Sequence, residues 1–187
     1  MPTHQLHLEK GETYFITFTC YRWLPLIEQT ELYPYFHKWF DYLDDHHVLL
    51  LGYVLMPNHV HLLLHQNEDS PKTLNTIVAN GKRFLAYEII KRLRIRCATH
   101  TLATLKAGVA KNEQKVGKQH QVFRLSFGAK RCFDLPMLHT KLNYIHANPV
   151  SGKWRLVDDW RLYEHSSAGF YELDQESDYL THYEDVW

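Results

Sequence analysis

Two apolar runs separated by a proline constrain this chain more than any other feature. Residues 48–55, VLLLGYVL, and 59–65, HVHLLLH, are rich in the aliphatic side chains of buried strands. The residues Met56-Pro57-Asn58 break the first run, because proline fixes φ and has no N–H to donate to a ladder. With so short a connection, we expect the two runs to pair as an antiparallel hairpin.

The elements around this hairpin are predicted from side-chain spacing. Aromatic and β-branched residues predict strands, apolar residues three and four apart predict helices, and Ser-Pro marks a helix start. A polar stretch rich in Lys, Gln, Gly and Thr predicts a loop. By these signals we expect a strand at 13–20, a helix at 28–45, a helix from Ser70-Pro71 to Arg96, a loop at 97–120, a strand at 121–127 and a helix from Asp134 to Ala147.

The resulting order, β-α-β-β-α-β, predicts an α+β fold. We expect a ferredoxin-like split βαβ antiparallel sheet with helices on one face, and the helix at 134–147 added at the C-terminal side. At 187 residues, of which 45% are hydrophobic, the chain is long enough to bury a sizeable core. We expect one domain over 1–187, with its core at about 10–168 and an acidic tail at 169–187.

Several classes of protein are disfavoured by composition. No apolar run approaches the roughly 20 residues that span a bilayer, and the N-terminal MPTHQLHLEK lacks the apolar stretch of a signal peptide. The three cysteines, Cys20, Cys97 and Cys132, are odd in number and far apart, so they suggest neither a disulfide framework nor a thiolate zinc site. We therefore expect a soluble, cytoplasmic protein with no membrane partner.

The formal net charge is zero, but the charges are segregated along the chain. Lys and Arg against Asp and Glu number 4 to 9 in residues 1–80, 16 to 3 in 81–155, and 1 to 9 in 156–187. A field of one sign over such a length is typical of phosphate binding. The predicted DNA-binding residues are Lys82, Arg83, Lys91, Arg92, Arg94, Arg96, Arg124, Lys130, Arg131 and Lys141.

Two histidines in the second run of the hairpin are candidate metal ligands. His59 and His61 are two apart on a predicted strand, so both side chains leave the same face. Imidazole is a common metal ligand, and a strand holds its ligands more rigidly than a loop. The alternative is a chance pair among 14 histidines. His65 has the same alternation but lies at the strand end, where we expect a surface residue.

The helix at 134–147 carries a tyrosine away from its apolar stripe. Leu135, Leu138, Leu142 and Ile145 recur at helical spacing, and Tyr144 lies about 140° from the centre of their stripe. Asn148 follows one turn later on the same face, where an amide oxygen could reach an ion beside the phenol. Asn148 also precedes Pro149, which suits a residue that ends a helix.

MPNHVHLL at 56–63 together with NYIHANPV at 143–150 closely resembles the single-tyrosine HUH transposases, especially their REP-associated tyrosine transposase branch. The resemblance covers about residues 10–168, including a basic helix like that at Lys82-Arg83-Phe84 and a segment like HSSAGFY at 165–171. It implies a ferredoxin-like fold, a divalent ion on His59 and His61, and Tyr144 as nucleophile. A polar residue at the position of Asn148 is implied as third ligand.

The implied reaction is cleavage of single-stranded or hairpin DNA. Mg²⁺ or Mn²⁺ would bind the non-bridging oxygens of the scissile phosphate while the phenol attacks in line, which leaves a 5′-phosphotyrosine and a free 3′-hydroxyl. Attack by another 3′-hydroxyl would rejoin strands. His146 is close to Tyr144 in sequence, but it lies well around the helix and is a poor proton acceptor.

Three departures from the family's pattern concern DNA preference more than chemistry. Ser151 stands where a basic residue is usual, Phe123 where tryptophan is frequent, and the 97–120 segment is long for the family.

Two other functions fit parts of the sequence. A non-catalytic ferredoxin-like nucleic-acid-binding module would explain the charge segregation, and a metal-dependent hydrolase using water would explain the histidines. The sequence leaves open whether the chain forms a homodimer, and whether Tyr144 acts in cis or in trans.

Overall fold

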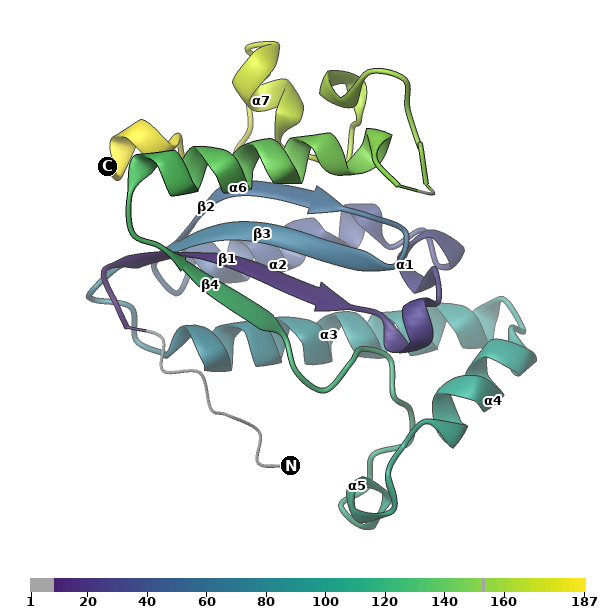
Figure 1. Ribbon diagram of the computed structural model, residues 1–187. Coiled ribbons are helices and arrows are strands. Elements are labelled where there is room, and N and C mark those ends of the chain that lie inside the picture. Colours follow the sequence, from purple (N-terminus) through teal and green to yellow (C-terminus); the bar gives the residue numbers. More distant parts are fainter. Residues whose placement is uncertain (1–8, 153) are drawn as a thin grey trace.

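The structure, a computed structural model, describes residues 9–152 and 154–187 (Figure 1). Its centre is a four-stranded antiparallel sheet in the order β2-β3-β1-β4, which confirms the ferredoxin-like split βαβ arrangement. The strands are β1 Glu12–Thr19, β2 Val48–Leu55, β3 His59–Gln66 and β4 Gly128–Cys132; the helices are α1 Leu26–Gln29, α2 His37–Asp44, α3 Leu74–Ile95, α4 Thr99–Ala107, α5 Lys111–Lys115, α6 Leu135–Ala147 and α7 Ala168–Glu172.

The predicted hairpin is present with its predicted turn. β2 and β3 pair antiparallel from Val48 opposite Gln66 to Leu55 opposite Val60, with one irregularity between Leu50 and Gly52. The aliphatic runs bury almost every side chain, because helices cover both faces of the sheet.

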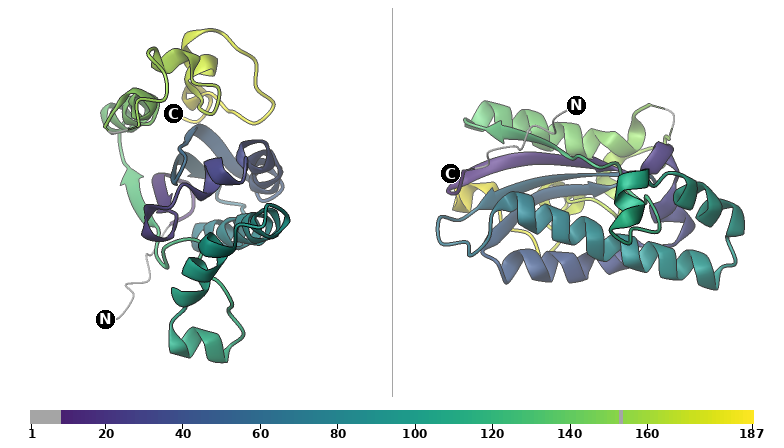
Figure 2. Two further views of the ribbon diagram at one scale, coloured as in Figure 1. Left: turned by 90° about the vertical axis from the view of Figure 1, so that its right-hand side faces the viewer. Right: turned by 90° about the horizontal axis from the view of Figure 1, so that it is seen from below.

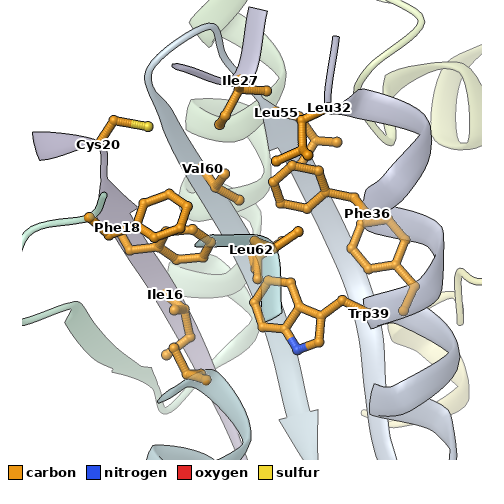
Figure 3. Close-up of a cluster of buried hydrophobic side chains, with 14 of the residues drawn as sticks. Ile16, Phe18, Cys20, Ile27, Leu32, Phe36, Trp39, Leu55, Val60 and Leu62 are labelled. Atoms are coloured by element: carbon orange, nitrogen blue, oxygen red, sulfur yellow. The ribbon is translucent and has the colours of Figure 1, made fainter. Parts of the chain in front are cut away.

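Alternate residues of β1 and β3 face opposite sides of the sheet. One face packs against α2 and α3, where Ile16 and Phe18 of β1 and Leu62 of β3 meet Phe36 and Trp39 (Figure 3). The other face packs against α6, which lies across the sheet on the side opposite α3 (Figure 2). The added helix was therefore predicted correctly, and it brings its residues close to the odd-numbered positions of β1 and β3.

The helix predicted at 28–45 is broken into pieces. α1 ends at Gln29, a 3₁₀ turn occupies Tyr33–Phe36, and α2 follows. Glu31 adopts a left-handed backbone, φ +48°, and Pro34 has no N–H for an α-helical hydrogen bond, so a continuous helix is excluded.

The start of α3 was predicted a few residues too early. The hydroxyl of Ser70 is buried and donates to the carbonyls of His46 and Lys72 rather than capping the helix. Thr73 is the N-cap instead, and its hydroxyl accepts from the backbone N–H of Thr76.

The region between α3 and α6 differs most from the prediction. Residues 97–120 contain α4 and α5 rather than only a loop, and Figure 1 shows both projecting away from α6. The last strand is Gly128–Cys132, not 121–127, where Phe123 makes only an isolated bridge with Cys20. β4 is an edge strand whose polar sequence buries only its final residue, so it carries no alternation that sequence could reveal.

The segment after α6 covers the edge of β2. The backbone N–H of Leu55 donates to His165, that of Ser167 to Tyr53, and that of Thr181 to Leu50. An uncovered strand edge invites pairing with other chains, so this segment protects the sheet. Among the described residues, no helix combines the length and the apolar character needed to cross a membrane.

Candidate functional site

His59 and His61 lie on the face of β3 that α6 covers. The register of the sheet places Thr17 of β1 opposite His61 and Thr19 opposite His59. The two imidazole ring centres are 4.9 Å apart, with their planes nearly perpendicular. The sheet therefore brings the predicted ligand pair together in one place.

His61 has one ring nitrogen satisfied and one without a partner. Its Nδ1 is 2.7 Å from the hydroxyl oxygen of Thr17. Its Nε2 is buried and has no hydrogen-bond partner among the described residues. Burial, with smaller effects from His59 and Lys141, lowers the pKa of His61 to about 3. The ring is therefore neutral at physiological pH. In the tautomer whose Nδ1 donates to Thr17, its Nε2 carries a lone pair that can bind an electrophile.

The orientation of His59 is set by its neighbour in sequence. Asn58 Nδ2 donates to the backbone carbonyl of Trp23 at 3.1 Å, so its Oδ1, 2.7 Å from His59 Nδ1, accepts the ring proton. This tautomer leaves a lone pair on His59 Nε2, which faces Asn148 Oδ1 at 3.2 Å. Burial lowers the pKa of His59, against a smaller raising effect of Asn148.

Two hydrogen-bond acceptors therefore face each other across 3.2 Å. Neither His59 Nε2 nor Asn148 Oδ1 carries a proton for the other, and His61 Nε2 nearby also lacks a donor. A cation satisfies all three, whereas a single water has only two protons to donate. The residues present thus fit a divalent ion, although the described residues contain no group of three His, Cys, Asp or Glu that could hold one.

Helix α6 places Tyr144 and Asn148 above these histidines. Asp134 caps the helix, because its side chain accepts from the N–H of Met137. Three of the four predicted stripe residues, Leu138, Leu142 and Ile145, are buried; Leu135 is largely exposed.

Tyr144 is 51% exposed, and its ring lies next to the histidines of its own chain. Its centre is 5.2 Å from that of His61 and 5.8 Å from that of Phe15. The Lys141 ammonium lies 4.9 Å from the Phe15 ring and 5.9 Å from the Tyr144 ring. Tyr144, the candidate nucleophile, therefore shares one site with the Lys141 ammonium and with the candidate metal ligands.

These side chains line an open cavity of about 910 Å³, here called the tyrosine pocket. Ala147, Ser151, Gly152 and Trp154 form part of its wall. Sequence reasoning missed three contributors, Thr17, Trp23 and Asn58, which were not candidates by residue type. The candidate functional residues in the lining are Thr17, Trp23, Asn58, His59, His61, Lys141, Tyr144 and Asn148.

Two other histidines lie outside the tyrosine pocket. His146 is buried beneath α6, with Nε2 2.9 Å from the hydroxyl of Ser167 and its ring stacked on Trp160. Burial lowers the pKa of His146 to about 4. His65, expected at the surface, is half-buried and pairs with the hydroxyl of Thr13 at 3.0 Å.

A second cavity of about 910 Å³, the basic groove, lies between α3 and residues 116–125. Its lining includes Arg83, Lys91, Arg94 and Arg124, and contains no Asp or Glu. Among the described residues, Arg83, Arg94 and Arg124 have no carboxylate within 4.0 Å, because no ion pair includes them. This groove therefore brings together three of the arginines predicted to bind DNA, Arg83, Arg94 and Arg124.

Lys82 lines the basic groove, but its ammonium binds the protein's own backbone. Its ammonium is mostly buried and donates to the backbone carbonyls of Arg124, Leu125 and Ser126. Burial lowers the pKa of Lys82 to about 8. Its charge is therefore used to hold residues 124–126 against α3, and it is a positioning residue more than a direct contact.

The remaining predicted DNA contacts are dispersed. Arg92 donates to Glu88 and to the carbonyls of Thr30 and Glu31, and Arg96 pairs with the Glu31 carboxylate. Their guanidinium groups thus hold the protein's own residues. Lys91 lies 3.6 Å from Glu88, Arg131 pairs with Glu12, Lys130 is exposed on β4, and Lys141 belongs to the tyrosine pocket.

Comparison with known proteins finds one solved structure with a similar fold. No family model matches the chain, and no curated protein matches it. A solved REP-associated tyrosine transposase, bound to a REP hairpin, is 18% identical; the match covers 97% of this chain and 94% of that one, at a TM-score of 0.56. A candidate transposase from Deinococcus radiodurans R1 is 15% identical over 78% of this chain and 95% of that one, at a TM-score of 0.38. The first likeness establishes a shared fold; the second is too weak to compare folds.

Proposed function

We propose that this chain is a transposase-type endonuclease of the REP-associated tyrosine kind, which nicks and rejoins single-stranded or hairpin DNA through a 5′-phosphotyrosine on Tyr144. The observation that carries the proposal is the meeting of Tyr144 with two histidine nitrogens and an amide oxygen that lack a donor. A non-catalytic binding module gives no reason for that arrangement.

His59 Nε2, His61 Nε2 and Asn148 Oδ1 would hold the divalent ion, Mg²⁺ or Mn²⁺. When bound, such an ion neutralises charge on the scissile phosphate and orients it for in-line attack. Asn58 and Thr17 hold the two rings through Nδ1, which is the usual second layer of a histidine metal site.

Tyr144 supplies the nucleophile from within the same chain. Its oxygen would form the new bond to phosphorus as the bond to the 3′-oxygen breaks, with the phenol proton passing to solvent. Lys141 lies beside the ring, where its ammonium can contact a phosphate oxygen. One phosphoester replaces another, so the reverse attack by a 3′-hydroxyl needs no external energy.

The basic groove supports DNA as the substrate. Uncompensated guanidinium groups bind the phosphate backbone regardless of sequence. The solved transposase that shares this fold is bound to a REP hairpin, which makes a DNA hairpin the first substrate to test.

The test is incubation with Mn²⁺ and hairpin DNA that has single-stranded flanks, followed by denaturing electrophoresis. The parent should form a protein–DNA adduct that survives denaturation, and Tyr144→Phe should bind the DNA and form none. Tyr179→Phe, a change at a tyrosine that lines neither the tyrosine pocket nor the basic groove, should behave as the parent. Cleavage that persists in Tyr144→Phe would indicate a hydrolase using water. Binding without cleavage in the parent would indicate a binding module.

A further inference from the structure

An exposed tryptophan stands at the edge of the tyrosine pocket. The side chain of Trp23 is 52% exposed, although tryptophan is the largest apolar residue. Arg22 and Trp23 both adopt left-handed backbone conformations, with φ +53° and +59°. Such conformations cost energy in residues other than glycine and persist where the surrounding structure holds them, often at functional sites.

The same amide that orients His59 also holds Trp23. Asn58 accepts the His59 ring proton through Oδ1 and donates to the Trp23 carbonyl through Nδ2. The indole lies edge-on to the His59 ring, with 5.8 Å between ring centres. Asn58 therefore holds the backbone of Trp23 in a fixed position relative to His59.

The rings of the site have a definite order. Trp23 contacts His59, His59 contacts His61, and His61 contacts Tyr144, with centre distances of 5.8, 4.9 and 5.2 Å. Trp23 and Tyr144 are thus the first and last members of this series of ring contacts, and the ligand pair links them.

The order of the rings matters for in-line attack, because it indicates on which side the leaving group departs. A nucleophile and its leaving group lie on opposite sides of the phosphorus atom. When the phosphate lies over the histidines and Tyr144 attacks, the 3′-oxygen leaves on the side of Trp23. The nucleotide that carries this oxygen is the one immediately 5′ of the cleaved bond.

We propose that Trp23 stacks on the base of that nucleotide and positions its 3′-hydroxyl. This rests on the proposed function. During cleavage the bond between phosphorus and the 3′-oxygen breaks, the bond to the Tyr144 oxygen forms, and the 3′-oxygen gains a proton from solvent. No covalent bond then holds the 5′ fragment, so stacking by Trp23 keeps its 3′-hydroxyl in place for strand joining.

The surface beyond Trp23 fits the continuation of the same strand. A cavity of about 520 Å³ is also lined by Trp23, together with Arg22, Arg124 and Glu113, whose carboxylate is paired with Lys118. Arg124 also lines the basic groove, so a strand that passes Trp23 meets positive charge in both places. Aromatic stacking followed by a basic track is a general arrangement for binding single strands.

The test combines protein variants with abasic DNA. Trp23→Ala, Trp23→Phe and the control Phe133→Ala, an exposed ring that lines none of the three cavities, are compared on a hairpin with abasic nucleotides placed in turn along its flank. Equilibrium affinity, the nicking rate and the rate of joining to a 3′-hydroxyl are measured. The stacking energy of one base corresponds to about tenfold or more in affinity.

The expected result is a loss of about tenfold in affinity and joining for Trp23→Ala, restored largely by Trp23→Phe. That loss should vanish at one abasic position, the one immediately 5′ of the nick mapped in the parent. An equal loss at every abasic position, or none on intact DNA, overturns the role of Trp23 while nicking by the parent leaves the proposed function standing. A parent that binds but does not nick refutes the proposed function, and the affinity scan still tests the stacking.

Discussion

The tyrosine pocket and the basic groove have about the same volume, but they differ in how firmly their functional side chains are held. In the pocket, each ligand candidate is fixed by a second residue, as His61 is by Thr17 and His59 by Asn58. In the groove, Arg83, Arg94 and Arg124 form no ion pair with any residue that the structure describes, and Lys82 anchors the backbone of residues 124–126. Phosphoryl transfer requires reacting atoms at fixed positions, whereas backbone binding requires mainly charge. Variants in the pocket should therefore abolish chemistry, and variants in the groove should weaken binding gradually.

Loss of a histidine should give the largest effect and leave the groove unaffected. His59→Ala or His61→Ala is expected to lower nicking by more than about 100-fold, beyond the loss typical of second-layer residues. Melting temperature should fall modestly in His61→Ala, because the ring's contacts with Thr17 and Phe15 are lost, while DNA affinity should be retained. Nicking, DNA affinity and melting temperature are measured together. Nicking that persists in both variants with Mg²⁺ or Mn²⁺ contradicts the metal assignment.

The Thr17 hydroxyl, which pairs with His61, offers a more specific test, and Thr13 in the same strand provides the control. Thr17→Val removes the partner of His61 Nδ1 and should lower Mn²⁺ affinity, measured by calorimetric titration, by about 10- to 100-fold. Thr13→Val removes the equivalent partner of His65, which lies outside the pocket, and should leave Mn²⁺ affinity unchanged. Equal effects of the two substitutions would show that the Thr–His pairs serve the sheet rather than an ion.

Acid should have a smaller effect, a fall in the free energy of unfolding caused by protonation of His146 on α6. Burial lowers the pKa of His146 to about 4, against about 6.5 in the unfolded chain. Between these values the unfolded state binds more protons, so stability is complete above pH 6.5 and is lost as pH falls toward 4. His146 should contribute about 2 kcal/mol to the loss between pH 7 and pH 5, and His59 and His61, whose pKa values burial also lowers, add to it.

Urea unfolding at the two pH values, with a chelator present, measures this loss. His146→Gln keeps a side chain that can bond to Ser167 and cannot be protonated, so it should lose correspondingly less stability in acid. The same acid dependence in parent and variant would show that other groups cause it.

The groove should show the smallest effect per residue. Arg83→Gln, Arg94→Gln and Arg124→Gln should each reduce DNA affinity a few-fold and lower the slope of log affinity against log salt by about 0.7 to 0.9. Nicking at saturating DNA should stay near the parent value. Arg161→Gln, whose guanidinium pairs with Asp159, is the control. A triple groove variant with an unchanged salt slope would remove DNA binding from this groove.

The two regions also differ in how far sequence could predict them. The hairpin and α6 were predicted because their apolar spacing records which side is buried. His59, His61, Tyr144 and Asn148 were chosen from their positions on those elements together with the resemblance to the HUH transposases. The partners Thr17, Trp23 and Asn58 could not be predicted, since they depend on strand register and on contacts between elements.

The positive charge of the basic groove was predicted from the sequence, but its shape was not. A count of Lys and Arg gives the positive segment. It does not distinguish Arg96, which pairs with Glu31, from Arg94, which pairs with no carboxylate in the described part of the chain. The 97–120 region was misassigned because α4 and α5 bury only one side chain, that of Leu105, and therefore show little periodicity.

The most direct test of the central claim is to locate the covalent link. The parent is trapped on hairpin DNA with Mn²⁺, the complex is digested with nuclease and protease, and peptides are sequenced by mass spectrometry. A phosphonucleotide joined through its 5′-phosphate to the peptide that contains Tyr144 is the predicted result. A link at another tyrosine such as Tyr87, or cleaved DNA with no modified peptide, would contradict the assignment of Tyr144 as the nucleophile.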